Sequence, residues 1–103
     1  MNFPVKITNL AIEQLRQVRR IHNHTEVPFI RIGIKGGGGC GGVANFIALD
    51  EKSEKDIIYD YENLQFAIEK GHLMYLVGLQ IDYVENETDK GFVFITETKS
   101  SKQ

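Results

Sequence analysis

The fold depends first on residues 29–49, FIRIGIKGGGGCGGVANFIAL, in which a glycine-rich segment separates two strand-like segments. Apolar residues alternate with polar or small ones over 29–35, which is the period of a strand with one buried face. The segment 43–49 is β-branched and aromatic, as strands commonly are. The sequence therefore predicts a strand, a glycine loop that carries the only cysteine of the chain, and a second strand.

The rest of the chain adds two helices and five strands. Thr8 or Asn9 can cap a helix that runs to about Asn23, because apolar residues recur there at steps of three and four. A second helix of about two turns follows Gly71 and is closed by Gly78. Because the strands cluster instead of alternating with long helices, the predicted fold class is α+β with about seven strands. The further strands are expected at 5–7, 56–61, 64–69, 79–85 and 91–96, with turns at Asp50–Ser53, Tyr61–Asn63 and Asn86–Lys90.

Length and composition predict one domain over residues 1–96 and a disordered polar tail over 97–103. The net charge of −2 gives no electrostatic support for binding nucleic acid or an anionic membrane. No signal peptide is recognised, and no apolar run approaches the roughly 20 residues that span a bilayer. A single cysteine suits a reducing compartment, so the expected location is cytoplasmic.

Four kinds of chemistry can use the glycine loop. A phosphate loop is disfavoured, because a dinucleotide motif must open a helix and this loop runs into a predicted strand. A nucleophilic cysteine needs a nearby base, and the candidates are His22, His24 and His72. Metal or cluster ligation fits the residues best, because glycines bring backbone N–H groups and a bulky cluster close to a thiolate. An ordinary hairpin tip with an incidental cysteine stays open.

The loop and a later segment together resemble the A-type iron–sulfur carriers, the HesB/IscA/SufA-like proteins of iron–sulfur cluster assembly. The resemblance runs from VKITNLAIEQL to Phe94, and its ordered motifs are IRIGIKGGGGCGG and MYLVGLQIDYVENETDKGFVF. The matching positions in the second motif are Tyr75, Leu76, Gly78, Ile81, Asp82, Tyr83, Gly91 and Phe92.

This resemblance implies a HesB-like, compact pseudo-barrel of mixed strands that binds a cluster, most simply [2Fe–2S], or iron, and passes it on without enzymatic turnover. It implies a homodimer or higher oligomer, and partners that are assembly scaffolds and apo-protein recipients. Cys40 is the residue that carries over as metal ligand. The residues that would shape its loop are Gly36, Gly37, Gly38, Gly39, Gly41 and Gly42.

The chain departs from the family pattern in three ways. The loop holds one extra glycine, Gly41 stands where serine is usual, and the C-terminal Cys-Gly-Cys is absent. A dimer would supply two thiolates, so other ligands must come from glutathione, a partner or carboxylates. The alternatives are a non-catalytic HesB-like scaffold that has lost metal binding, and a thiol redox or nucleophilic enzyme.

The remaining acidic residues favour structural roles. Asp82 is expected to satisfy backbone groups near the second helix, and Asp50 to initiate the turn after its strand. The segment 50–56, DEKSEKD, is expected to be a solvated turn, because it lacks the spacing of a calcium loop.

Overall fold

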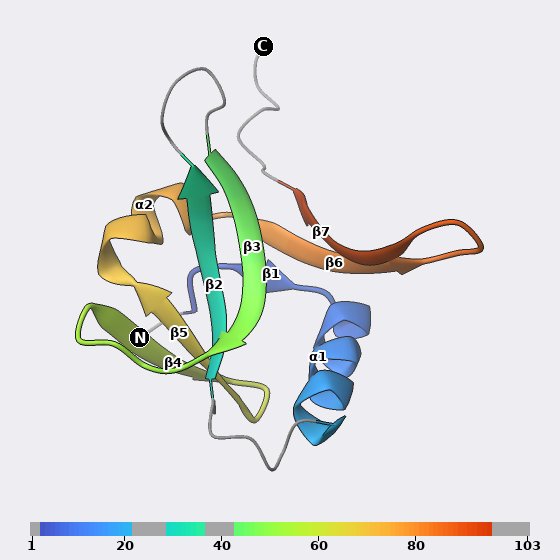
Figure 1. Ribbon diagram of the computed structural model, residues 1–103, viewed down its shortest axis with the longest axis horizontal. Coiled ribbons are helices and arrows are strands. Elements are labelled where there is room, and N and C mark those ends of the chain that lie inside the picture. The colour runs from blue at the N-terminus through green and yellow to red at the C-terminus, as the bar shows by residue number, and fades with distance from the viewer. Residues whose placement is uncertain (1–2, 22–28, 37–42, 96–103) are drawn as a thin grey trace. The chain divides into compact units, whose positions relative to one another are not determined.

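A computed structural model of the chain describes residues 3–21, 29–36 and 43–95 (Figure 1). Chain contacts divide it into two compact units, Met1–Asn23 with Val77–Gln103, and His24–Leu76. The described part contains seven strands in two sheets and two α-helices, which confirms the α+β class. Within it neither sheet closes into a barrel. The boundary between a domain and a tail at residue 96 stays a prediction, because residues 96–103 lie outside the described part.

The first unit holds a three-stranded sheet in the order β1-β6-β7 (Figure 1). Strand β1 (Lys6–Ile7) runs parallel to β6 (Gln80–Glu85), which forms an antiparallel hairpin with β7 (Lys90–Ile95). Helix α1 (Asn9–Ile21) packs against β6. The buried apolar residues of this unit are Val5, Ile7, Ala11, Ile12, Leu15, Leu79, Ile81 and Tyr83.

Thr8 ties the start of α1 to β6. Its Oγ1 accepts the N–H of Ala11 (3.2 Å), as an N-cap does, and its hydroxyl donates to Oδ1 of Asp82 (2.7 Å). The same Asp82 oxygen accepts the N–H of Tyr83 (2.8 Å). Both hydrogen bonds lower the pKa of Asp82, and the one from Thr8 has the larger effect. The structural role predicted for Asp82 is confirmed. The prediction that it acts near the second helix is wrong, because its carboxylate binds Thr8 at the start of the first helix.

The second unit holds a four-stranded sheet in the order β3-β2-β5-β4. Strand β2 (Phe29–Gly36) is antiparallel to β3 (Val43–Asp50), and β4 (Asp56–Tyr61) is antiparallel to β5 (Leu64–Glu69). Parallel pairing of β2 with β5 joins the two hairpins. The buried apolar residues of this unit are Ile30, Ile32, Tyr59, Leu64, Phe66, Ala67, Ile68 and Leu76.

The second helix is shorter than predicted. A 3₁₀ turn, η1 (Lys70–His72), leads into α2 (Leu73–Leu76), which has only four residues. Gly78 has the positive φ expected of it (86°), but its N–H donates to the carbonyl of Pro4 (3.1 Å) instead of closing a helical turn. None of the described helices is long and apolar enough to cross a membrane.

Candidate functional site

The predicted site lies between the paired ends of β2 and β3. These strands pair along their whole length, from Phe29 opposite Asp50 to Gly36 opposite Val43. The segment 37–42 therefore connects two residues that lie directly opposite each other in the sheet. Of the predicted site residues, the structure describes Gly36 alone. Cys40 and the other five glycines, Gly37, Gly38, Gly39, Gly41 and Gly42, lie outside the described residues.

The backbone at Gly36 explains why the glycine-rich segment begins there. Its φ is 87°, in the region where a side chain is strained and glycine is not. The segment after the loop is a strand from Val43 onward, as predicted, and not a helix. A dinucleotide-binding loop requires a helix N-terminus to hold the pyrophosphate, so the described neighbours of the loop do not provide that site.

Side chains pack closely against the backbone of β2 at Gly33. A Cβ at Gly33 would lie 2.9 Å from Cε1 of Phe46 and 3.3 Å from Nδ1 of His72. The ring of Phe46 therefore lies directly against the backbone of β2. The ammonium of Lys35 lies 5.0 Å from the centroid of the same ring, within the range of a cation–π interaction.

Only one of the three candidate bases is described. His72 ends the 3₁₀ turn η1, and its Nε2 lies 3.9 Å from Oε1 of Glu69. It contacts the hairpin that carries the cysteine loop, near Gly33. His22 and His24 lie outside the described residues, as does Cys40. A histidine–thiol pair therefore stays a prediction.

The guanidinium of Arg31, in the second unit, donates four hydrogen bonds. It forms two hydrogen bonds with Asp56 (2.7 and 2.8 Å), one with Asp50 (2.7 Å), and one with the carbonyl of Glu51 (2.9 Å). The hydrogen bonds to Asp56 are the main cause that raises the pKa of Arg31. Hydrogen bonding by Arg31 lowers the pKa of Asp56 to about 2, although burial opposes the shift.

The prediction of a solvated turn over 50–56 is confirmed for residues 50–55, which are exposed, and is wrong for Asp56, which is buried. The Asp56 side chain is 0% exposed, and its carboxylate also accepts the N–H of Ser53 (2.7 Å). Asp50 does initiate the turn, since its Oδ1 accepts the N–H of Glu51 (2.8 Å). The signal in the sequence was an arginine between two isoleucines, Ile30 and Ile32, since a charged side chain requires a partner when it is buried.

The Asp56 carboxylate makes stability depend on acid. Its folded pKa of about 2 lies below the ordinary value of 3.8, so the stabilisation is complete above about pH 4 and is lost as the pH falls through about 2. The shift corresponds to about 2 kcal/mol. The free energy of unfolding measured in urea should fall between pH 4 and pH 2 by more in the wild type than in Asp56→Asn. Equal slopes for both proteins would contradict this assignment.

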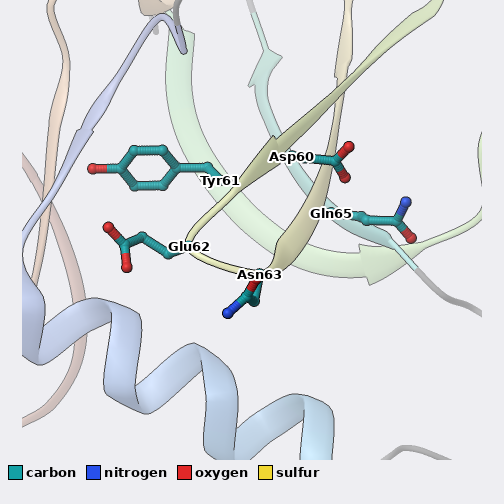
Figure 2. Close-up of a pocket in the computed structure, with 5 residues that line it drawn as sticks. All are labelled: Asp60, Tyr61, Glu62, Asn63 and Gln65. Carbon is teal, nitrogen blue, oxygen red and sulfur yellow. The ribbon is translucent and has the colours of Figure 1, made fainter.

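In the two described surface depressions, the polar side chains do not converge on a common point. The larger one, of about 500 Å³, surrounds the tip of the β4–β5 hairpin. Figure 2 shows Tyr61 and Glu62 pointing to one side of this hairpin, and Asp60 and Gln65 to the other. A second depression, of about 300 Å³, lies on the β6–β7 hairpin. Among the described residues, no group of three histidine, cysteine or carboxylate side chains could hold a metal ion.

Comparisons with known proteins identify the family. The model of the iron–sulphur cluster biosynthesis family matches residues 3–99. A Bacillus subtilis (strain 168) protein, SufA, is 33% identical over 93 residues, which cover 89% of this chain and 76% of that protein. The iron–sulfur cluster insertion protein ErpA of Buchnera aphidicola subsp. Acyrthosiphon pisum (strain APS) is 33% identical over 89 residues, 86% of this chain and 77% of that protein.

Structural comparison gives the same answer. The crystal structure of IscA with the [2Fe–2S] cluster matches with a TM-score of 0.72 and 25% identity, covering 93% of this chain and 87% of that one. The HesB-like fold that the resemblance implied is therefore the fold of this chain. The chain belongs to the iron–sulphur cluster biosynthesis family, and its role lies in the biogenesis of iron–sulfur clusters.

Proposed function

We propose that this chain is a carrier that binds an iron–sulfur cluster, or iron, through Cys40 in an oligomer and passes it to apo-proteins. The observation that carries the proposal is the position of the single cysteine. It lies in a glycine-rich connection between two strand ends that the register places opposite each other. The similarity to IscA, which was crystallised with a [2Fe–2S] cluster, supports this cargo.

The ligand count requires more than one chain. A [2Fe–2S] cluster takes four ligands, and each chain offers one thiolate. Two chains would supply two thiolates, and the other two ligands would come from a low-molecular-weight thiol, a partner protein or carboxylates. A cluster with two exchangeable ligands is released readily, which suits transfer to a recipient. No turnover is needed for this role, so we expect a carrier and not an enzyme.

Anaerobic reconstitution tests the proposal. Wild-type protein incubated with iron, sulfide and a thiol should develop visible charge-transfer absorption and bind iron and sulfide in stoichiometric amounts. Size-exclusion chromatography should then place the coloured species at the mass of a dimer or larger. Cys40→Ala should remove the absorption completely, because the chain has no second thiolate to replace it.

Cys40→Ser is the matched control, since it keeps the size of the side chain and replaces the sulfur ligand with a much weaker one. It should lose nearly all of the colour while both variants keep the unfolding midpoint of the apo-protein. A colourless wild type, with and without glutathione, would reject metal carriage and favour the scaffold alternative. Rapid alkylation of Cys40 with no iron bound would favour a thiol enzyme instead.

A further inference from the structure

We propose that the outer edge of β7 (Lys90–Ile95) is the surface on which a second copy of this chain docks, by adding its own β7 as an antiparallel strand. The two three-stranded sheets would then form one continuous sheet across a twofold axis. The inference rests on the proposed function for the need of a second chain. The surface itself belongs to the apo-protein and consists of described residues.

Strand β7 is the outermost strand of its sheet. Among the described residues it pairs with β6 alone, from Lys90 opposite Glu85 to Ile95 opposite Gln80. The register is continuous and has no bulge, and neither a proline nor a charged residue follows Lys90 within the strand. Edge strands of soluble proteins commonly carry such features, which prevent pairing with another chain. Strand β7 lacks them over its last five residues.

A hydrogen bond in the turn fixes which backbone groups of β7 face outward. The N–H of Asn86 donates to the carbonyl of Asp89 (2.8 Å), so these two residues form a hydrogen-bonded pair. Bonded and non-bonded pairs alternate along an antiparallel ladder. The N–H and C=O groups of Lys90, Phe92 and Phe94 therefore point away from β6.

The opposite side of β6 gives the same alternation independently. Ile81 lies opposite Phe94, and its carbonyl accepts the N–H of Thr8 (3.0 Å) on the side of β6 that faces away from β7. Ile81 and Phe94 are therefore a non-bonded pair within the hairpin, as the turn requires. The backbone groups of Phe94 are thus directed to a strand beyond β7.

The apolar layer of the hairpin becomes less buried toward this edge. On one face of β6, Ile81 is 0% exposed and Tyr83 is 7% exposed. Phe94 and Phe92 lie opposite them and share their face, but both are only half-buried. On the other face, Ile95 is 46% exposed. An added strand would cover apolar side chains on both faces, and burial of apolar surface is the main driving force of association.

The edge is complementary to itself in an antiparallel arrangement. An axis at Phe92 places Phe92 opposite its own copy, and Lys90 of each chain opposite Phe94 of the other. All three outward-facing residues then pair, which gives about six hydrogen bonds between the chains. No charge lies opposite a like charge, and such a twofold interface is the commonest kind in soluble oligomers.

The charges of the β6–β7 turn favour the antiparallel orientation over the parallel one. The turn carries Glu87 and Asp89, which a parallel pairing would place beside their own copies. In the antiparallel pairing the two copies of Asp89 are separated by six residues along the strands, or about 20 Å. That distance exceeds the Debye length of about 8 Å at physiological salt, so the repulsion is screened.

Analytical ultracentrifugation of the apo-protein tests this interface. With a reductant present, so that thiols cannot join chains, the wild type should show a reversible monomer–dimer equilibrium between about 1 and 300 μM. Val93→Lys should raise the dissociation constant at least about tenfold, because it puts a charge on this edge and the twofold axis repeats it. Val93→Thr, which stays β-branched and uncharged, should change the constant by less than about threefold.

Ala48→Lys is the matched control. It adds the same charge at an exposed position of β3, which is an edge strand of the other sheet, and should leave the dissociation constant within about twofold of the wild type. Circular dichroism shows whether each variant is folded. A wild type that stays monomeric throughout, or a dimer that Ala48→Lys weakens and Val93→Lys does not, would overturn the proposal.

Hydrogen exchange of the wild type tests the same edge without a substitution. The outward-facing amides of Phe92 and Phe94 should exchange at least about tenfold more slowly well above the dissociation constant than well below it. The amides of Gly91 and Val93, which face β6, should change little and provide the internal control. Equal protection of the outward-facing amides at both concentrations would mean that the same chain covers the edge, and would refute docking of a second copy.

These measurements need no iron, so the two proposals can fail separately. A dimeric wild type that remains colourless after reconstitution would reject cluster carriage and leave the β7 interface intact. A monomeric apo-protein that still develops stoichiometric cluster absorption would reject the interface and leave carriage intact.

Discussion

Replacing Arg31 with alanine is expected to lower the free energy of unfolding by about 3–5 kcal/mol, the usual cost of breaking a buried ion pair. The Asp56 side chain is 0% exposed and receives two hydrogen bonds from Arg31. Without the guanidinium, Asp56 must either stay charged without its main partner or take up a proton. Urea unfolding followed by circular dichroism measures the loss.

Two further variants separate the ion pair from a general effect of removing charge. Arg31→Lys should recover only part of the stability, because an ammonium cannot form the two parallel hydrogen bonds that the guanidinium makes with Asp56. Lys90→Ala breaks an exposed pair with Glu85 (3.7 Å) and should cost less than about 1 kcal/mol. If Arg31→Ala lowered the free energy of unfolding no more than Lys90→Ala does, the stabilising role of the buried pair would be contradicted.

Replacing Gly33 with valine is expected to destabilise the protein by about 2–3 kcal/mol, as overpacking of a well-packed site commonly does. The added Cβ would lie 2.9 Å from Cε1 of Phe46, closer than side chains tolerate, so the ring must move off the backbone of β2. The preference of valine for strands offsets less than about 1 kcal/mol of this cost. Thermal unfolding and the ring resonances of Phe46 in NMR spectra provide the measurements.

Gly71→Ala is the matched control, because nothing lies within 4 Å of a Cβ at Gly71. Its stability should stay within about 0.5 kcal/mol of the wild type. Combining Gly33→Ala with Phe46→Leu should cost less than the sum of the single changes, since the shorter side chain makes room for the new methyl group. Additive effects, or equal stability of Gly33→Val and Gly71→Ala, would contradict the contact.

Local patterns in the sequence predicted the elements well where one backbone preference dominates. The bounds of β4 and β5 agree residue for residue with the predicted segments 56–61 and 64–69. Their turn is narrower than expected, because Glu62 and Asn63 both take positive φ (54° and 64°) and form a two-residue loop. The second helix was too long in the prediction, because the bond from Gly78 to Pro4 joins positions far apart in the chain.

The candidate site also has a part that the sequence predicted and a part that it did not. Residue chemistry alone singled out Cys40 and its glycines, because a single thiol among residues without side chains can be recognised directly in the sequence. The close packing of Phe46 and His72 on Gly33 was not predictable, since no local pattern says which distant ring will lie on a given glycine. The partner of Arg31 was equally hidden, because Asp56 lies 25 residues away in a segment that reads as a surface turn.

The sequence by itself therefore determined the α+β class, the order of the strands along the chain and the residue types at the cysteine loop, because each depends on neighbours within a few positions. Only the tertiary structure decided that β2 pairs in parallel with β5 and β1 with β6. It alone decided that Arg31 binds two aspartates and that the Lys35 ammonium contacts the Phe46 ring. Those choices depend on which surfaces meet when distant segments bury their apolar faces together, and that energy is absent from any local stretch of sequence.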